Sequence, residues 1–300
     1  MNRYAIVEAP SILGLKPTGV ERLPAVLLQH GLADELRARR AGRVEPKAAY
    51  DTERDPATLT LNARGIAEYA VQLADTVAGI IDRGEFPILL GGDCSILLGS
   101  SLALRRRGRY GLLFIDGHAD FYQPEANPNG EAASMDLAFA TGRGPELLTN
   151  LEGLRPLVRD EDVVVFGFRD ADEQRQYGSQ PLPSQMLALD LSEVRRLGVA
   201  RASQRAVEHL TVPEPATRGF FIHLDADVVS DDLMPAVDYR MPDGLTWDEL
   251  RTVLEFALAS GRAVGLEVTI YNPALDESGA GGRGLTRTLI EALRESTVPS

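Results

Sequence analysis

The stretch Tyr110–Asp120, YGLLFIDGHAD, contains an apolar run that ends abruptly in two aspartates and a histidine. Residues 111–115 show no alternation of apolar and polar side chains. Strands that are buried on both faces have this pattern, and they are typical of parallel sheets covered by helices. The stretch therefore predicts an inner strand of an α/β protein, with polar side chains at its carboxyl end.

Five further apolar segments are predicted strands, and the segments between them have helical periodicity. The predicted strands cover residues 4–9, 86–93, 162–170, 218–229 and 263–273. The predicted helices cover residues 19–40, with an interruption or a start at Pro24, and residues 62–84, 100–108, 246–261 and 285–295. This alternation favours a parallel sheet covered on both faces. No internal repeat or low-complexity linker interrupts it, so we expect one domain over residues 1–300.

Composition and charge narrow the classes of partner. The chain has 300 residues, of which 44% are hydrophobic, enough for a sizeable core. Its formal net charge of −13 argues against a nucleic acid or an anionic membrane as partner. The single cysteine excludes an internal disulfide and fits a reducing compartment. No stretch approaches the roughly 20 apolar residues of a membrane span, and no apolar signal core opens the sequence, so we expect a cytoplasmic protein.

Acidic residues and histidines recur at every second position where two predicted strands end. They are Asp116, His118 and Asp120 after one strand, and His223, Asp225 and Asp227 at the end of another. Residues of one parity share a strand face, and parallel strands present their carboxyl ends at the same edge of the sheet. One such motif alone more often marks a solvated loop or a helix cap. Two together would bury charge at great cost without a cation, so they predict a divalent metal site whose oxygen-rich donors suit Mn²⁺.

The turn Gly91–Ser95, GGDCS, follows another predicted strand and contains Cys94, the only cysteine. A lone thiol at this turn could be a nucleophile, a metal ligand or a buried filler. No histidine lies near it in the sequence to act as its base, and the acidic motifs account better for the chemistry. Glu267, inside the apolar segment 263–273, is a further acidic residue on a predicted strand.

These motifs together resemble the ureohydrolase superfamily, which includes arginases, agmatinases, formimidoylglutamases and guanidine hydrolases, and the likeness is greatest to arginases. The superfamily pattern GGDHS, DAHxD and SxDxDxxDP with a late glutamate is matched by GGDCS (91–95), DGHAD (116–120), HLDADVVSD (223–231) and GLEVTIYNP (265–273). The segment GFRDAD (167–172) also resembles arginases, and the likeness spans nearly the whole chain. It implies a three-layer α/β/α domain with a mainly parallel sheet of about eight strands, usually assembled as a trimer or hexamer.

Carried over by position, the resemblance implies a binuclear manganese centre. The second metal would be held by Asp116, His118, Asp225 and Asp227. The first metal would be held by Asp116, Asp120, Asp225 and the residue at Cys94. Two metals lower the pKa of a shared water, so a bridging hydroxide would attack a guanidinium or amidine carbon.

The resemblance also implies catalytic and substrate-binding roles. Asp120 would move a proton toward the leaving amine, and Glu267 would pair with the guanidinium and orient it. Asn129 would contact the substrate at the place where arginases contact its carboxylate. Asp172 falls where arginases contact the α-amino group.

Cys94 stands where the superfamily has a histidine ligand, and two interpretations stay open. In one, Cys94 binds the metal and shifts its preference from Mn²⁺ toward Zn²⁺, Co²⁺, Fe²⁺ or Ni²⁺. In the other, Cys94 is a neutral thiol packed at the turn, and the first metal site is weak or empty.

Other positions depart from the pattern near the substrate. His223 replaces a serine of the superfamily and could either hydrogen-bond a metal-binding carboxylate or be a satisfied core histidine. Ala133 stands where arginases place a proton-shuttling histidine. Tyr122 replaces an asparagine that reads the substrate carboxylate, and residues 230–244 lack the DP and the glycine-rich run that border the guanidinium pocket. These changes leave the substrate open.

The sequence therefore predicts a metal-dependent, urea-releasing hydrolase of a linear C–N bond in a small guanidino or amidino compound. The alternative is a non-catalytic or metal-poor relative with a binding or regulatory role, because a ligand histidine and a shuttle histidine are both missing. A third reading is an amide hydrolase on the same fold, but the catalytic histidine pair of such enzymes is not visible in the sequence.

Overall fold

Eight parallel strands form one sheet in the computed structural model, which describes residues 4–212 and 217–295. The strands are β1 Tyr4–Ala9, β2 Arg39–Arg43, β3 Phe86–Gly91, β4 Gly111–Ile115, β5 Val163–Phe166, β6 Leu187–Leu189, β7 Phe220–Asp225 and β8 Ala263–Thr269. Their order across the sheet is β2-β1-β3-β8-β7-β4-β5-β6. The two last strands of the chain thus lie between β3 and β4, and this insertion makes β7 the neighbour of β4.

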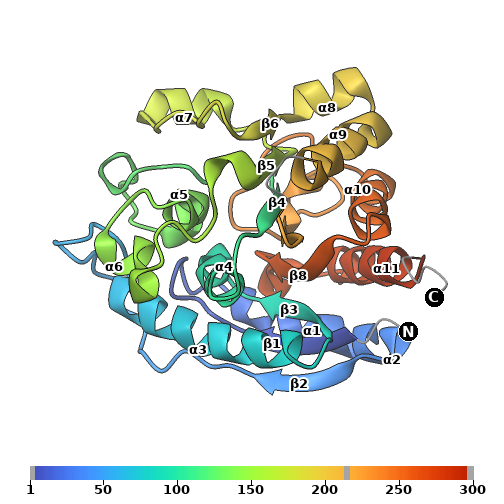
Figure 1. Ribbon diagram of the computed structural model, residues 1–300, viewed down its shortest axis with the longest axis horizontal. Coiled ribbons are helices and arrows are strands. Elements are labelled where there is room, and N and C mark those ends of the chain that lie inside the picture. The colour runs from blue at the N-terminus through green and yellow to red at the C-terminus, as the bar shows by residue number, and fades with distance from the viewer. Residues whose placement is uncertain (1–3, 213–216, 296–300) are drawn as a thin grey trace.

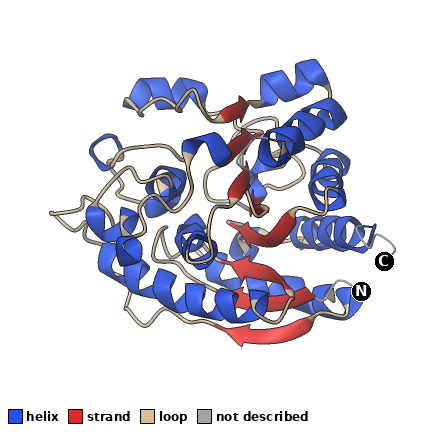
Figure 2. Cartoon of the chain, viewed as in Figure 1, coloured by secondary structure: helices blue, strands red, loops and turns tan. Residues whose placement is uncertain are grey.

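Helices cover both faces of the sheet, as Figures 1 and 2 show. They are α1 Leu23–Gln29, α2 Leu32–Leu36, α3 Ala63–Ile81, α4 Leu97–Arg105, α5 Asp136–Ala140, α6 Glu146–Thr149, α7 Ala171–Tyr177, α8 Leu191–Leu197, α9 Val199–Thr211, α10 Trp247–Ala259 and α11 Ala280–Glu295. Side chains of α3 to α6 share one buried apolar cluster with the sheet. Side chains of α1, α2 and α8 to α11 share a second cluster on the opposite face. The expected three-layer α/β/α architecture is confirmed.

Helix α3 shows how the apolar pattern becomes packing. Its residues Ile66, Leu73, Val77 and Ile80 are at most 1% exposed, and they recur at the spacing of one helix face. Each such side chain contributes about 1.5–3 kcal/mol when it is fully buried. Gly84, at a φ of 70°, follows the helix in a left-handed conformation that favours glycine.

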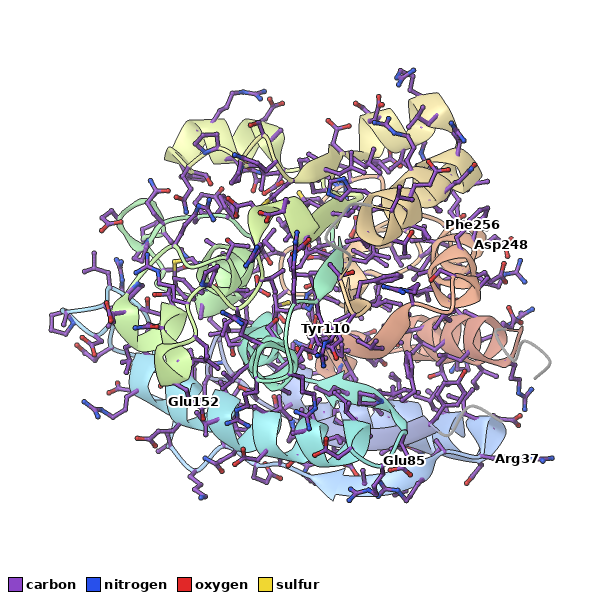
Figure 3. The ribbon with its side chains drawn as sticks, viewed as in Figure 1. Arg37, Glu85, Tyr110, Glu152, Asp248 and Phe256 are labelled. Atoms are coloured by element: carbon purple, nitrogen blue, oxygen red, sulfur yellow. The ribbon has the colours of Figure 1, made fainter. Side chains whose placement is uncertain are left out.

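The predicted helix over residues 19–40 is wrong in its continuity beyond Gln29 and in its last residues. Gly31 and Arg37 have left-handed backbone angles, so the helix divides into α1 and α2 and then ends. The next residues form β2, an edge strand that pairs with β1. Its arginines bind Glu8 and Glu85, and Figure 3 labels Glu85 close to β2. A strand at the edge of a sheet can be this polar because both its faces are reached by water or by counter-charges.

Helix α11 begins five residues earlier than the apolar periodicity predicts. Its first turns contain three glycines, which disfavour a helix by roughly 1 kcal/mol each. A Cβ at Gly282 would lie 2.4 Å from the hydroxyl of Tyr271, and one at Gly284 would lie 2.6 Å from the indole of Trp247. Close packing against these two rings explains why glycines occur inside a helix.

Strands β2 and β6 and helices α5 to α9 were not predicted. The buried face of α9 consists mainly of Ala202, Ala206 and Leu210, and small side chains give a weak apolar signal. Helix α7 buries none of its side chains. Within residues 4–212 and 217–295, no helix combines the length and apolarity that crossing a membrane requires.

Candidate metal centre

The turns that follow β3, β4 and β7 meet at the carboxyl edge of the sheet. They form the floor of a pocket of about 270 Å³. Of the predicted metal ligands, those exposed to this pocket are Cys94, His118, Asp120, Asp225 and Asp227. Asp116 is fully buried beneath them. The structure therefore brings together all six residues that the resemblance assigns to the metals.

The side chains of the turn after β4 lie close together, but the backbone conformation that brings them together differs from the predicted one. The strand ends at Ile115, so strand parity does not apply to Asp116, His118 and Asp120. The backbone N–H of His118 instead donates to Asp116 Oδ1 at 2.6 Å, and Asp120 has a left-handed φ of 45°. A tight turn, rather than an extended strand, directs the three side chains to one place.

The turn after β7 is tied to the turn after β4. The backbone N–H of Asp227 donates to Asp225 Oδ1 at 2.8 Å, and the backbone N–H of Gly117 donates to Asp227 Oδ1 at 3.0 Å. Asp227 Oδ2 lies 2.9 Å from His118 Nδ1. Burial opposes the charge on His118, but Asp227 outweighs it and raises the pKa of the imidazole to about 10.

Cys94 begins the short 3₁₀ helix Cys94–Ile96, and Asp93 holds this turn in place. The Asp93 carboxylate accepts hydrogen bonds from the backbone of Ser95 and the hydroxyl of Ser11, both at 2.9 Å. The Cys94 thiol donates to Asp225 Oδ2 at 2.9 Å and lies 3.2 Å from the hydroxyl of Thr269. Burial, aided by the nearby Asp225, raises the pKa of the thiol well above its usual value. Without a cation, Cys94 is therefore a protonated donor to a carboxylate.

The substitution Gly92→Ala should disrupt this turn. A Cβ at Gly92 would lie 1.8 Å from the backbone oxygen of Ser11, and a backbone atom held by the Asp93 N–H cannot move aside. We expect a loss of at least about 2 kcal/mol in the free energy of unfolding, measured by urea titration. The control is Gly79→Ala in α3, which meets nothing closer than 3.8 Å and should stabilise by about 0.5–1 kcal/mol. Equal effects of the two substitutions would contradict the steric argument.

Carboxylates are crowded at the centre. Burial first, and then repulsion by neighbouring carboxylates, raises the pKa of Asp116, Asp225 and Asp136 well above the usual range. Burial raises the pKa of Asp120 to about 8. A divalent cation among these groups would favour their ionised forms, which is the usual way in which proteins hold so many buried acids.

The donor atoms fit a metal centre. Three groups of side chains could each hold an ion, because within each group one donor atom per residue lies within 4.8 Å of the others. The groups are Asp116, His118 and Asp227; Cys94, Asp116, His223 and Asp225; and Cys94, Asp120 and Asp136. The described buried atoms without a hydrogen-bond partner include four at this centre: Asp116 Oδ2, Asp136 Oδ2, His223 Nε2 and Glu267 Oε2. An unpartnered buried polar atom costs about 1–3 kcal/mol, which a bound cation would offset. Asp116 takes part in two of the groups, as a bridging ligand requires.

Glu267 and His223 lie behind the floor of the pocket. Neither side chain lines it, and both are 0% exposed. Glu267 Oε1 lies 2.7 Å from His223 Nδ1, so the two side chains are partners of each other. The structure thus gives Glu267 a histidine partner in the place where the resemblance implies a substrate guanidinium.

Asn129 and Asp172 have different places in the structure. Asn129 lines the pocket, where its amide donates to Glu131 and to the hydroxyl of Tyr239. Asp172 does not line it, and its side chain is 93% exposed beside Arg175. The carboxylate of α7 that does face the pocket is Glu173.

Three acidic residues near the centre were missed by the sequence reasoning. Glu173 and Asp238 line the pocket, and Asp136 lies behind Asp120 with 0% exposure. Asp136 had a detectable signal, because it is the only charged residue in the run SMDLAFA. Glu173 lies in a polar segment, where an acidic residue carries no such signal, whereas Asp238 follows the short apolar run 233–237.

The fold and the donor set define a three-layer α/β protein with a candidate binuclear metal centre. The family model described as "Arginase: Arginase family" matches residues 5–294. The chain therefore belongs to the arginase family.

Individual relatives agree with this assignment. Arginase from Bacillus caldovelox is 28% identical over 283 residues, which cover 92% of this chain and 93% of that protein. Arginase from Bacillus subtilis (strain 168) is 30% identical over 224 residues, which cover 74% of this chain and 73% of that protein. The solved native structure of arginase from Bacillus caldovelox at pH 5.6 matches with a TM-score of 0.86 at 26% identity, over 98% of each chain.

Family membership confirms the resemblance to arginases and the fold that it implies. It supports an enzyme of the ureohydrolase type, a metal-dependent hydrolase of guanidino groups in small substrates. The identity of the metals as Mn²⁺, the cytoplasmic location and the homo-oligomer stay predictions.

Proposed function

We propose that the chain hydrolyses a linear C–N bond in a small, cationic guanidino or amidino compound and releases urea or its analogue. The observation that carries this proposal is the charge of the pocket. None of the described residues that line it is a lysine or an arginine, whereas five are carboxylates: Asp120, Glu173, Asp225, Asp227 and Asp238. Asp120, Asp225 and Asp227 would be neutralised by the metal ions, so Glu173 and Asp238 are the carboxylates left to favour a cationic substrate, and their oxygens match the donors of a guanidinium.

The proposed metal centre is binuclear. One ion would be held by Asp116, His118, Asp225 and Asp227, and the other by Asp116, Asp120, Asp225 and the residue at Cys94. We expect Mn²⁺ at the site that lacks the thiol. When bound, two such ions activate water as a nucleophile near neutral pH.

Asp120 is our candidate for proton transfer. It faces the pocket, and a carboxylate there can accept a proton and pass it to a leaving group. Ala133 lines the same pocket and cannot carry a proton. His118 is the one imidazole among the described residues lining the pocket, and it is paired with Asp227. Asp120 would therefore pass the proton to the leaving amine without help from a shuttle histidine.

The outer part of the pocket would hold the far end of the substrate. Asn129 and Tyr239 lie at the mouth, joined by a hydrogen bond of 3.2 Å. We propose Glu173 as the contact for a second cationic group, since it faces the pocket and Asp172 does not. Asn129 stays a candidate contact for a polar or anionic group.

Urea release from a panel of substrates tests the proposal. Full-length protein is loaded with Mn²⁺, Co²⁺ or Zn²⁺ and given arginine, agmatine, guanidinobutyrate or guanidine. We expect turnover of at least one compound. A compound with a net positive charge should be preferred over the zwitterionic guanidinobutyrate, because the pocket is acidic. Failure to hydrolyse any of them, with two metal equivalents bound, would contradict catalysis and favour a binding role.

A matched pair of variants tests which carboxylate of α7 contacts the substrate. Glu173→Gln should raise KM for a substrate with a second cationic group about tenfold, the effect of about 1.4 kcal/mol of binding free energy. Asp172→Asn removes the neighbouring carboxylate, which points away, and should leave KM unchanged. A larger effect of the second substitution would restore Asp172 as the substrate contact.

A further inference from the structure

His223 lies in a row of side chains that crosses three neighbouring strands beneath the candidate metal centre. It pairs in register with Phe114 on β4 and with Glu267 on β8. Its ring is stacked on Phe114, with centroids 4.6 Å apart and planes 6° apart. Its Nδ1 lies 2.7 Å from Glu267 Oε1. The imidazole is therefore held by a ring on one side and by a carboxylate on the other.

The second ring nitrogen of His223 is directed at the centre and has no partner. Nε2 is buried and makes no hydrogen bond, and it lies 4.0 Å from Asp116 Oδ2, which also lacks one. This separation is too long for a hydrogen bond. Metal bonds of about 2.0–2.3 Å place two ligands of a tetrahedral ion about 3.3–3.8 Å apart, so a shift of a few tenths of an ångström would bring both atoms onto one ion.

The hydrogen bond to Glu267 also selects the correct tautomer. In a neutral imidazole, a carboxylate that accepts from Nδ1–H leaves Nε2 with its lone pair free to bind a metal. Histidines that bind metals in proteins are commonly oriented in this way by a carboxylate.

We propose that His223 Nε2 is a metal ligand, and that it forms a four-donor site with Cys94, Asp116 and Asp225. The proposal rests on the binuclear centre of the proposed function and replaces its first site by one with an imidazole, a thiolate and two carboxylates. The missing histidine at position 94 is thus supplied from β7. Glu267 is a positioning residue in this site, acting through His223 rather than on the substrate.

The geometry of all four residues supports this site. Their donor atoms lie within 4.8 Å of one another, and the four side chains are buried. Cys94 already contacts Asp225, at 2.9 Å. Binding would exchange the proton of the Cys94 thiol for the metal ion and release this proton to solvent. A site with sulfur and imidazole donors prefers Zn²⁺ or Co²⁺ to Mn²⁺, so the two sites should differ in the metal they select.

Cobalt binding to the metal-free, full-length protein tests the proposal. The wild type should bind two equivalents of Co²⁺ and show the near-ultraviolet charge-transfer band of a thiolate ligand. Cys94→Ser should lose the band. His223→Asn should lower the affinity of the thiolate site more than about 100-fold, because removing even an indirect partner of a ligand costs about 10–100-fold.

Two further variants provide a second test and a control. Glu267→Gln keeps the size of the side chain and should weaken Co²⁺ binding at this site about 10–100-fold with a changed spectrum, even if His223→Asn does not fold. His209→Asn makes the same change on α9, outside all three donor groups, and should leave the binding of both equivalents unaltered.

The outcomes separate this proposal from the proposed function. A folded His223→Asn protein that binds two equivalents with the affinity and spectrum of the wild type would overturn the ligand role and make His223 a core residue. Full urea release by that variant would leave the hydrolase proposal intact. The variant could lose the thiolate site while the wild type hydrolyses no guanidino compound. This result would support the ligand role of His223 and contradict the proposed substrate class.

Discussion

The substitution Asp116→Asn should remove both metal sites at once. The Asp116 carboxylate belongs to the donor group with His118 and Asp227 and also to the group with Cys94, His223 and Asp225. An amide binds divalent cations more weakly than a carboxylate. Because both ions would share Asp116, its substitution weakens both sites. We expect affinity for both equivalents, and with it hydrolysis, to fall more than about 100-fold, which exceeds the effect of altering an indirect partner. Metal content after dialysis against a chelator-buffered ion measures this loss.

The same variant should be more stable than the wild type without metal. Burial and neighbouring carboxylates raise the pKa of Asp116 in the native state, so above the unfolded pKa its ionisation lowers the stability of the metal-free fold. Asparagine removes this ionisation and can still accept the hydrogen bond from His118 N–H. We expect a higher free energy of unfolding at pH 7 than for the metal-free wild type, measured by urea titration.

Asp162→Asn is the matched control for stability. Asp162 is also buried, but its carboxylate accepts two hydrogen bonds from Arg109, at 2.7 and 2.9 Å. Neutralising a paired carboxylate should destabilise by about 1–3 kcal/mol, the opposite sign to Asp116→Asn. A metal-free Asp116→Asn protein that is less stable than the wild type would show that the carboxylate is structural rather than held for a cation.

Local patterns predicted the inner strands and the clustering of the candidate metal ligands well. Residues 111–115 are apolar at every position, and only a strand buried on both faces explains this. The turns that carry Cys94, Asp116 and Asp225 follow such runs directly, so their place at the carboxyl edge of the sheet could be inferred. Edge elements were harder, because β2 is as polar as a loop and is held by ion pairs with Glu8 and Glu85.

The pairing of distant residues could not be predicted from one sequence. The partner of Glu267 is His223, 44 positions away, and their contact depends on β8 lying beside β7 in one particular register. A shift by one residue would turn either side chain to the other face of the sheet. The two departures at positions 94 and 223 therefore looked independent in the sequence, whereas the fold places both side chains at one donor group.

The metal-free protein should lose stability as the pH rises from about 5 to about 8. Asp116, Asp136 and Asp225 have raised pKa values in the native state, and that of Asp120 is about 8. A group with a raised native pKa stabilises the fold below its unfolded pKa, and this contribution is lost as the pH rises toward the native pKa. Each native proton retained costs about 1.4 kcal/mol per pH unit, so one such group lowers the free energy of unfolding by on the order of 4 kcal/mol over this window.

The other two titratable groups discussed for this centre, His118 and Asp227, do not reverse the decrease in stability with rising pH. The pKa of His118 is raised to about 10, so its contribution also falls as the pH rises above about 6.5. Burial tends to raise the pKa of Asp227, but the charge and hydrogen bond of His118, together with Arg169 and the Gly117 N–H, lower it, and its stabilising contribution is already complete above about pH 4. Urea midpoints of the metal-free protein at pH 5, 6, 7 and 8 measure the slope. Saturating metal should flatten or invert it, because cations replace the protons and bind only the native state. A metal-free protein whose stability is constant or rises with pH would mean that these carboxylates are hydrated and not crowded, and the case for a cation among them would lose its electrostatic basis.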